Sequence, residues 1–440
     1  MKKRLLLIAL FVLTLCLCFA FASCDAQPLT FKLYGDSYAV VNCFGNATSV
    51  VIPSAYRDKP VTSIGENAFS GCDRLTSIEI PNSVTSIGEH AFDGCASLTS
   101  IVIPDSVTSI GAGAFYGCEV LESITIGDSV TSIGKNAFEE CFGLINIEIS
   151  SSVTSIGENA FDGCYSLKYN KYENGLYLGN NENPYVILIK VKDKNIKSFE
   201  INKNTKVICS AFENCTSLTS IEIPSGVTSI GGDAFRDCTN LASIEIPNSV
   251  TSIGEWAFYG CTNLTSIKIP NSVTSIGKDA FRDCTSLASI NIPNGVTSVG
   301  DGAFENCTSL ASINIPRGVT SIGDGAFYGC DSLTSIEIPN SVTRIGYSVF
   351  YSCDSLTSVT IPDSVTSVGN GAFAFCESLT SIIIPNSVIE MSNFAFDGCP
   401  NLTIYCEAEK KPSGWNRYWN HLNSPYSTYC PVEWGYKQDN

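Results

Sequence analysis

The chain has 440 residues and a formal net charge of −17, and only 16% of its residues are charged. This acidic balance, with no basic run beyond the N-terminus, argues against nucleic acid as a partner, because binding to phosphates requires clustered Lys and Arg. The length alone would suggest two or three domains, but a continuous internal repeat predicts one elongated domain.

Residues 1–23 have the pattern of an export signal. A basic start at residues 2–4 precedes an apolar run over residues 5–19, and small residues follow. The end of this segment, Phe21-Ala-Ser-Cys24, resembles a bacterial lipobox, in which Cys24 would be the first mature residue and would carry a lipid that attaches the protein to a membrane. Two alternatives stay open: cleavage after Ala22, which would release a secreted chain, and an uncleaved membrane anchor.

Residues 24–49 are expected to cap the N-terminal end of the repeat. Within them, residues 31–41 alternate between apolar and polar side chains as a hairpin does. A cap is required because the first coil of a stacked structure would otherwise expose its apolar edge.

Residues 50–404 repeat with a period of 23 residues, apart from an irregular coil over residues 165–211. A Phe stands three residues before each of fourteen equivalent cysteines, and a Leu three residues after. This period is typical of a solenoid, in which each unit buries its apolar face against its neighbours. The equivalent cysteines are Cys72, Cys95, Cys118, Cys141, Cys164, Cys215, Cys238, Cys261, Cys284, Cys307, Cys330, Cys353, Cys376 and Cys399.

One unit, residues 98–118, shows how a coil is expected to fold. Ile101 and Ile103 alternate with exposed positions, as in a short strand, and a proline ends this strand. Residues 107–110 form a second extended segment on the opposite wall. The pair Ala114-Phe115 is expected to make a tight helical turn that brings its ring and the next thiol into the core.

The repeated pattern L-x-x-I-x-I-P-x-x-V-x-x-I-G-x-x-A-F-x-x-C resembles the BspA-type leucine-rich repeat, from about residue 50 to residue 404. The resemblance implies a β-rich leucine-rich-repeat solenoid of about 15 coils, with parallel strands, short helical turns and a cap at each end. It also implies a secreted or surface-attached microbial protein linked to adhesion and to contact with host or neighbouring cells.

The equivalent cysteines are expected to be buried free thiols. Identical positions on adjacent coils point the same way, with Cβ atoms about 5 Å apart, whereas a disulfide needs about 3.8 Å. Zinc needs thiolates that converge from different directions, often as C-x-x-C pairs, and the chain has no such pair. Cysteine also packs well as a small apolar residue.

The irregular coil, residues 165–211, separates Cys164 from Cys215 by 51 residues, which is two units plus five. Its sequence indicates a hairpin-like excursion rich in tyrosine, including Tyr172 and Tyr177. These tyrosines either form a platform for a ligand or cover the core where the coil is irregular.

Residues 405–440 do not repeat, hold three of the four tryptophans, and are expected to form a C-terminal cap. A binding module is the alternative. Cys406 and Cys430 are the candidate disulfide pair of the chain.

The chain shows no catalytic constellation. Its two histidines, His90 and His421, lie in a variable loop and in the cap, and no His or Lys recurs beside the repeated Ser and Thr. Glu222 and Glu245 on neighbouring coils could mimic a glycosidase or calcium site, but we interpret them as part of a solvated face whose charges prevent aggregation. We therefore expect neither an enzyme nor a bound cofactor or metal.

The expected function is binding, by a monomer, of a protein or glycan partner on a host or neighbouring cell. Partners are expected on the variable convex loops or on the concave strand face, because repeated positions are committed to packing. A structural spacer and a carbohydrate-active enzyme are the alternatives. The candidate contact residues are Trp256, Tyr259, Tyr328, Tyr347, Tyr351, Tyr172 and Tyr177 on the loops, and Glu222 and Glu245 on the strands.

Overall fold

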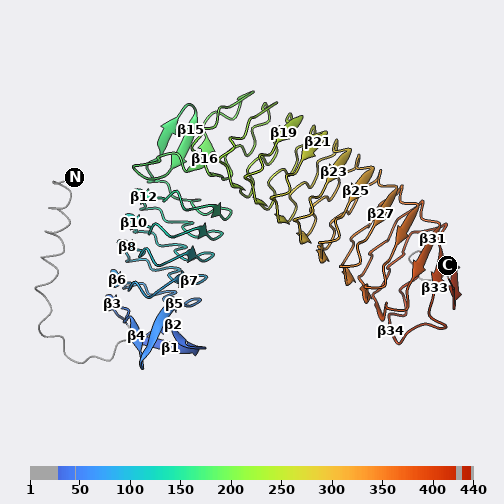
Figure 1. The fold of residues 1–440 in the computed structure, drawn as a ribbon, viewed down its shortest axis with the longest axis horizontal. Coiled ribbons are helices and arrows are strands. Elements are labelled where there is room, and N and C mark those ends of the chain that lie inside the picture. The colour runs from blue at the N-terminus through green and yellow to red at the C-terminus, as the bar shows by residue number, and fades with distance from the viewer. Residues whose placement is uncertain (1–27, 45, 423–428, 438–440) are drawn as a thin grey trace, which may run out of the picture.

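The computed structural model describes residues 28–44, 46–422 and 429–437. In these ranges the chain forms 35 strands and no helix, so none of the described residues forms a helix that could cross a membrane. The strands stack into a parallel β-solenoid of about 16 coils that bends into an arch (Figure 1). The proposed export signal, with Cys24, lies outside the described residues.

Each regular coil contributes two short strands. Each strand pairs in parallel with the equivalent strand of the next coil, so that every residue lies opposite the residue 23 positions later. For example, Ile101 lies opposite Ile124 in one sheet, and Ile110 lies opposite Ile133 in the other. The isoleucine of each strand points into the core, while the residues on either side of it are more exposed.

The strands of the outer sheets are β3 (Ser49–Val51), β6 (Ser77–Glu79), β8 (Ser100–Val102), β10 (Ser123–Thr125), β12 (Asn146–Glu148), β19 (Ser243–Glu245), β21 (Ser266–Lys268), β23 (Ser289–Asn291), β25 (Ser312–Asn314), β27 (Ser335–Glu337), β29 (Ser358–Thr360), β31 (Ser381–Ile384), β33 (Thr403–Cys406) and β35 (Val432–Trp434). The strands of the inner sheets are β5 (Lys59–Ile64), β7 (Ser86–Ile87), β9 (Ser109–Ile110), β11 (Ser132–Ile133), β13 (Ser155–Ile156), β17 (Val207–Ile208), β18 (Ser229–Ile230), β20 (Ser252–Ile253), β22 (Ser275–Ile276), β24 (Ser298–Val299), β26 (Ser321–Ile322), β28 (Arg344–Ile345), β30 (Ser367–Val368), β32 (Glu390–Met391) and β34 (Gly414–Trp415). The remaining strands are β1 (Leu29–Tyr34), β2 (Ser37–Cys43), β4 (Ala55–Tyr56), β14 (Asn170–Tyr172), β15 (Gly175–Leu178) and β16 (Ile187–Val191).

The longer strands lie on the outside of the arch and the two-residue strands on the inside, which reverses the expected concave strand face. In the N-terminal arm, β6, β8, β10 and β12 follow the outer edge while β7 lies on the inner edge (Figure 1). The extra antiparallel strands of the irregular coil lie at the outer side of the bend (Figure 1), and they join the inner sheet of the C-terminal arm through the parallel pairing of β16 with β17.

The turn that contains the core phenylalanine is not helical, so the expected helical turn is wrong. His90 and Gly94 have positive φ angles of 50° and 67°, and a right-handed helix cannot contain such residues at every fourth position. The N–H groups of His90, Phe92 and Gly94 donate to carbonyl oxygens of the next coil at 2.7–2.8 Å. The turn therefore forms a third ladder between coils instead of bonds within one helix.

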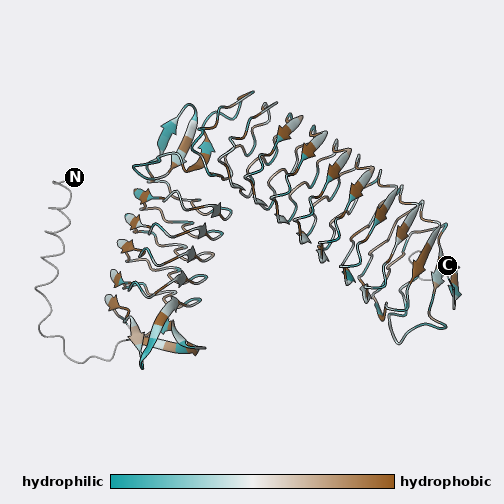
Figure 2. Cartoon of the chain, in the orientation of Figure 1, coloured by the Kyte–Doolittle hydropathy of each residue, from teal (hydrophilic) through white to brown (hydrophobic). Residues whose placement is uncertain are grey.

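The core is built from identical side chains stacked coil upon coil. The phenylalanine rings of successive coils lie nearly parallel, and their centroids are 5.0 Å apart at Phe69–Phe92 and 5.6 Å apart at Phe327–Phe350. Figure 2 shows apolar residues recurring on the strands of coil after coil. The buried residues form two clusters, one in each arm, and the row of phenylalanines is interrupted between Phe161 and Phe212.

The equivalent cysteines form a ladder of free thiols, and all but the half-buried Cys72 are buried. Each thiol after the first of its arm donates to the phenylalanine carbonyl of the preceding coil, as Cys118 Sγ does to Phe92 O at 3.2 Å. Burial raises the pKa of the Cys164 thiol to about 12, which keeps it protonated and able to donate. The ladder thus satisfies carbonyl groups inside the core.

Each described end of the solenoid is covered by non-repeating chain. At the N-terminal end, β1 and β2 form an antiparallel hairpin, and β2 continues in parallel with β5. At the other end, Trp419 meets the last stacked ring, Phe396, edge to face at 6.0 Å.

The two cysteines of the C-terminal segment are buried free thiols in the structure. Cys430 Sγ lies 3.7 Å from Phe396 O, the carbonyl that follows next along the cysteine ladder. Cys430 therefore extends the ladder by one position. The proposed disulfide between Cys406 and Cys430 is not formed in the structure and stays a prediction for the oxidised protein.

Substitution of Phe258 by alanine is expected to destabilise the protein by roughly 3–5 kcal/mol, because it removes a fully buried ring that stacks on Phe235 and Phe281. The control, Thr251→Ala in the same coil, removes an exposed side chain whose hydroxyl donates to Thr228 O at 3.2 Å, and should cost under about 1 kcal/mol. Urea denaturation followed by circular dichroism measures both. Equal losses of stability in the two variants would contradict the assignment of Phe258 to the core and of Thr251 to the surface.

Candidate binding site at the bend

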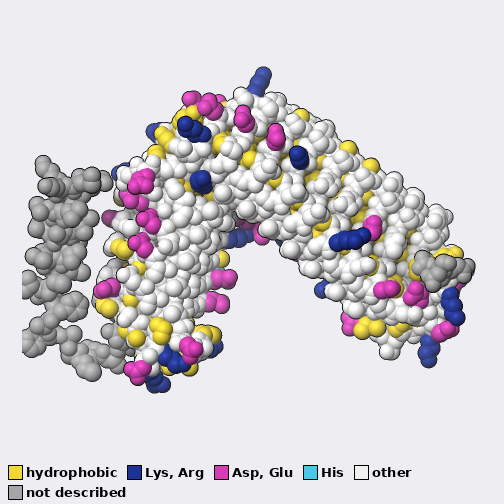
Figure 3. All heavy atoms as spheres, viewed as in Figure 1, with side chains coloured by type: hydrophobic (Ala, Val, Ile, Leu, Met, Phe, Trp, Pro, Cys, Tyr) yellow, Lys and Arg dark blue, Asp and Glu magenta, His cyan; other side chains and the backbone are white. Residues whose placement is uncertain are grey.

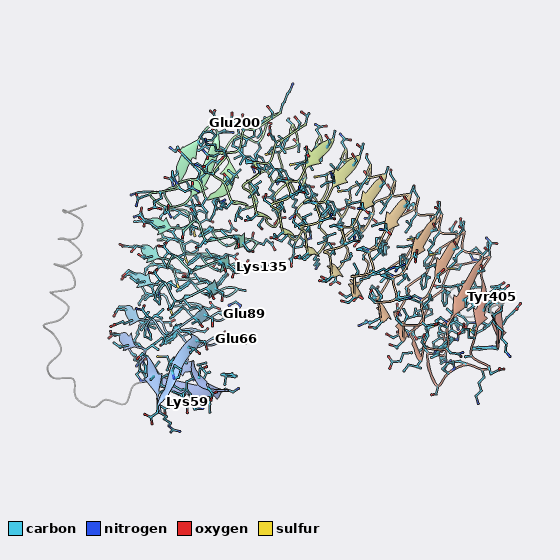
Figure 4. All side chains as sticks on the ribbon, viewed as in Figure 1. Lys59, Glu66, Glu89, Lys135, Glu200 and Tyr405 are labelled. Atoms are coloured by element: carbon cyan, nitrogen blue, oxygen red, sulfur yellow. The ribbon has the colours of Figure 1, made fainter. Side chains whose placement is uncertain are left out.

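The two arms of the solenoid meet at the inner side of the bend. Thr228 Oγ1, in the C-terminal arm, donates to Thr154 O, in the N-terminal arm, at 3.3 Å. Lys135 Nζ lies 3.5 Å from Glu255 Oε2, although the two residues are 120 positions apart in the chain. Figure 4 shows Lys135 on the inner side of the arch and Glu200 on the outer side. The irregular coil fills the space that opens outward from this contact.

A cleft of about 530 Å³ lies where the arms and the irregular coil come together. Its apolar surface comes from half-buried side chains such as Tyr169, Ile189 and Cys209, which pack against the N-terminal core cluster. Its polar lining includes carboxylates from both arms and cations from the irregular coil and the C-terminal arm. These charged residues are Glu158, Asp162, Lys190, Lys194, Glu213, Asp233 and Arg236.

Beside this cleft, cations and aromatic rings from both arms form a group that we call the inner-corner cluster: Lys135, Arg236, Trp256 and Tyr259. Lys135 Nζ lies 5.6 Å from the centre of the Trp256 ring. The Arg236 guanidinium lies 5.8 Å from the same ring and 5.2 Å from that of Tyr259. These distances suit cation–π attraction. Trp256 Nε1 also donates to Asp279 Oδ2 at 3.0 Å, which fixes the indole ring.

Carboxylates at the bend are paired with these cations. Lys135 Nζ lies 2.6 Å from Glu158 Oε2, and this hydrogen bond raises the pKa of Lys135. Arg236 donates to Asp233 Oδ1 at 3.2 Å. Burial nevertheless raises the pKa of Asp233 to about 6, because the cost of desolvation exceeds the stabilising effect of Arg236.

A second group of predicted aromatics lies further along the C-terminal arm. The rings of Tyr328 and Tyr351 are stacked at 4.7 Å, and Phe375 continues the row at 5.1 Å from Tyr351. Tyr347 is 55% exposed, whereas Tyr328 and Tyr351 are half-buried. Rings stacked in this way offer mainly their edges to solvent.

Of the two alternatives for the tyrosines of the irregular coil, Tyr177 follows the second, because it covers the core and does not form a platform. Tyr177 is fully buried in the C-terminal core cluster, and its hydroxyl oxygen accepts a hydrogen bond from Asn202 N at 3.3 Å. Its assignment as a contact residue is therefore wrong, because the antiparallel pairing of β15 with β14 and β16 places its ring inside. Tyr172 is half-buried, and its hydroxyl donates to Glu200 Oε1 at 2.9 Å.

Glu222 and Glu245 are neighbours on adjacent coils of the outer face, not of a concave face. The next position along this row is Lys268, opposite Glu245. On the face seen in Figure 3, charged and apolar side chains are scattered among backbone atoms and uncharged polar side chains. Within the described part of the chain, no three His, Cys, Asp or Glu side chains gather as a metal site requires.

The sequence identified Trp256 and Tyr259 but missed their partners. Lys135 and Arg236 occupy ordinary variable positions of their units, and nothing in the sequence indicates that they approach one another. The one available signal was the interruption of the period, since a break in register is where the chain can bend. Only the structure brings residues of the two arms together there.

The geometry defines the class of protein as a parallel β-solenoid with a repeated core and variable side chains on its surface. A family model for the BspA type leucine rich repeat region matches residues 35–168, 191–311 and 297–408. The chain belongs to this family of leucine-rich-repeat proteins.

Several solved structures are similar to the chain. A leucine-rich repeat protein from Bacteroides ovatus is 27% identical, with 94% of this chain and 100% of that chain covered and a TM-score of 0.47. A leucine rich cell surface protein from Faecalibacterium prausnitzii is 29% identical, with 93% and 99% covered and a TM-score of 0.35. No curated protein sequence matches the chain.

Replacement of Lys135 by alanine should destabilise the protein by about 1–3 kcal/mol, because it leaves the nearly buried Glu158 carboxylate without its ammonium partner. Lys278→Ala is the matched control, since Lys278 occupies the same repeat position and is exposed as Lys135 is, but forms no ion pair among the described residues, and it should cost under about 0.5 kcal/mol. Thermal denaturation measures the difference. Equal melting temperatures for the two variants would mean that the ion pairs at the bend contribute nothing to stability.

Proposed function

We propose that the protein is an exported, non-catalytic binding protein that contacts a protein or glycan partner at the inner side of its bend. The observation that carries this proposal is the inner-corner cluster. Its side chains come from both arms and from variable positions of the repeat, and each cation lies within 6 Å of the centre of at least one of the two rings.

The chemistry of the cluster supports binding. Tryptophan, tyrosine and arginine are the residues that most often dominate the energy of an interface. Trp256 and Tyr259 are half-buried, so each ring is held in place while part of it stays accessible. The repeated Phe, Cys, Leu and Ile side chains are committed to the core, which leaves specificity to residues such as these.

The N-terminal sequence supports the location. A basic start, an apolar run and the lipobox-like residues 21–24 are the features by which a bacterial lipoprotein is exported and anchored. An anchored arch would present the inner side of its bend to molecules outside the cell. We propose a monomer attached through Cys24, and free secretion is the alternative outcome.

Loss of the cluster's rings should abolish partner binding. The test compares wild type with Trp256→Ser/Tyr259→Ser in a binding assay against extracellular-matrix proteins and cell-surface glycans, and we expect at least about tenfold weaker binding by the variant. The control, Tyr328→Ser/Tyr351→Ser, removes half-buried aromatics from the second group and should bind as wild type does. If the control loses affinity while the first variant keeps it, the site lies along the C-terminal arm instead.

Replacement of Cys24 by alanine should release the protein from the membrane fraction, because the thiol that would carry the lipid is gone. Fractionation of cells and mass spectrometry of the mature N-terminus provide the measurement. A wild-type protein that begins at Ser23 with no added mass would instead identify a secreted chain.

A further inference from the structure

We propose that the cleft at the bend is a saccharide site, in which one face of Tyr165 stacks on a neutral sugar ring and polar groups of both arms bind its hydroxyls. This inference rests on the proposed binding function and names the ligand class and a residue that the sequence did not single out. It concerns the cleft, which adjoins the inner-corner cluster through Arg236.

Tyr165 is exposed in an unusual way for an aromatic residue of this solenoid. It lines the cleft and is 84% exposed. One face of its ring stacks on Phe142 of the preceding coil, with centroids 5.8 Å apart and planes parallel.

The other face of the Tyr165 ring points away from Phe142, toward the position that the next coil would occupy. In a regular coil the next unit would cover that face, but here the next equivalent cysteine, Cys215, comes 51 residues after Cys164. The position after Cys215 is Thr216, which carries no ring. The interruption of the repeat therefore leaves a whole ring face open at the edge of a polar cleft, whereas the stacked Tyr328 and Tyr351 offer edges.

The cleft also holds polar groups that the fold leaves unused. In the described residues, no hydrogen bond or ion pair engages the side chains of Asp162, Lys190 and Asn214, all of which line the cleft. They supply a carboxylate acceptor, an ammonium donor and an amide that can do both. A sugar hydroxyl likewise donates and accepts, so it can pair with any of them.

The charges of the cleft favour a neutral ligand over an ion. Its lining combines four carboxylates, Glu158, Asp162, Glu213 and Asp233, with the cations of Lys190, Lys194 and Arg236. Mixed charges this nearly balanced create no strong field of one sign, so they would not concentrate an anion or a cation.

The shape of the cleft fits the same ligand class. Its volume of about 530 Å³ lies within the range of about 300–1,000 Å³ that is usual for small-molecule sites. A sugar ring has C–H groups on its faces and hydroxyls on its edge. The cleft offers a flat aromatic face and the apolar side chains of Tyr169 and Ile189 to the former, and polar groups to the latter. A peptide could form hydrogen bonds with the polar groups of the cleft, but its backbone has no apolar ring to stack on the open face of Tyr165.

The test screens the purified chain against cello-, malto-, manno- and chito-oligosaccharides, with oligogalacturonate as an acidic probe and lysine oligopeptides as a basic one. Isothermal titration measures the affinity of each. We expect at least one neutral oligosaccharide to bind, and Tyr165→Ala to weaken it by at least about tenfold. Tyr165→Phe should keep the affinity, because it retains the ring face. Tyr347→Ala, which removes an exposed tyrosine far along the C-terminal arm, should not change it.

Two results would overturn the inference. One is the absence of binding by every neutral oligosaccharide at millimolar concentration, and the other is binding that Tyr165→Ala leaves unchanged. Tyr165 is so exposed that its loss should not unfold the protein, and equal melting temperatures of the variants verify this. The proposed binding function is judged separately: a protein partner that needs Trp256 and Tyr259 would support that function even if the cleft binds no sugar.

Discussion

The whole structure depends on the burial of one coil against the next. A single 23-residue unit has two very short strands and one non-helical turn, and none of these elements can bury its apolar side by itself. Stacking solves this problem by placing identical residues in register. Phenylalanine then packs on phenylalanine, and each cysteine thiol after the first of its arm donates to the backbone of the coil before it. Because every coil presents the same surface, the chain must supply a different structure at each end, and Trp419 covers the last ring of the row.

The same constraint explains why the candidate site lies where it does. As long as the register holds, variable side chains form long rows that are spread over the surface. At residues 165–211 the register is lost, the buried side chains separate into two clusters, and the arms turn toward each other on one side. Side chains that are far apart in the chain are thereby brought together, such as Lys135 with Glu255 and Trp256. The cost of the interruption is a less regular core, and its result is a cleft with charged, polar and aromatic groups.

Two expectations drawn from the resemblance to other repeats were wrong for local reasons. The turn after Gly88 cannot be helical, because His90 and Gly94 have positive φ angles and the N–H groups of His90, Phe92 and Gly94 donate to the next coil. Without helices on one flank, the longer strands need not lie on the inside of the curve. In this protein they lie on the outside, and Glu222 and Glu245 lie there with them (Figure 1).

The sequence by itself determined the solenoid, the period and the residues of the core, because a strict repeat of Phe, Cys, Leu and Ile allows only one way of burying them all. It also identified the place where the repeat fails. It could not determine the direction of the bend, the burial of Tyr177, or the meeting of Lys135 with residues about 120 positions later. These depend on how an irregular segment packs between two rigid arms, which is a property of the assembled coils and not of any single unit. For the same reason, Tyr165 is an ordinary variable residue in the sequence and an open ring face only in the tertiary structure.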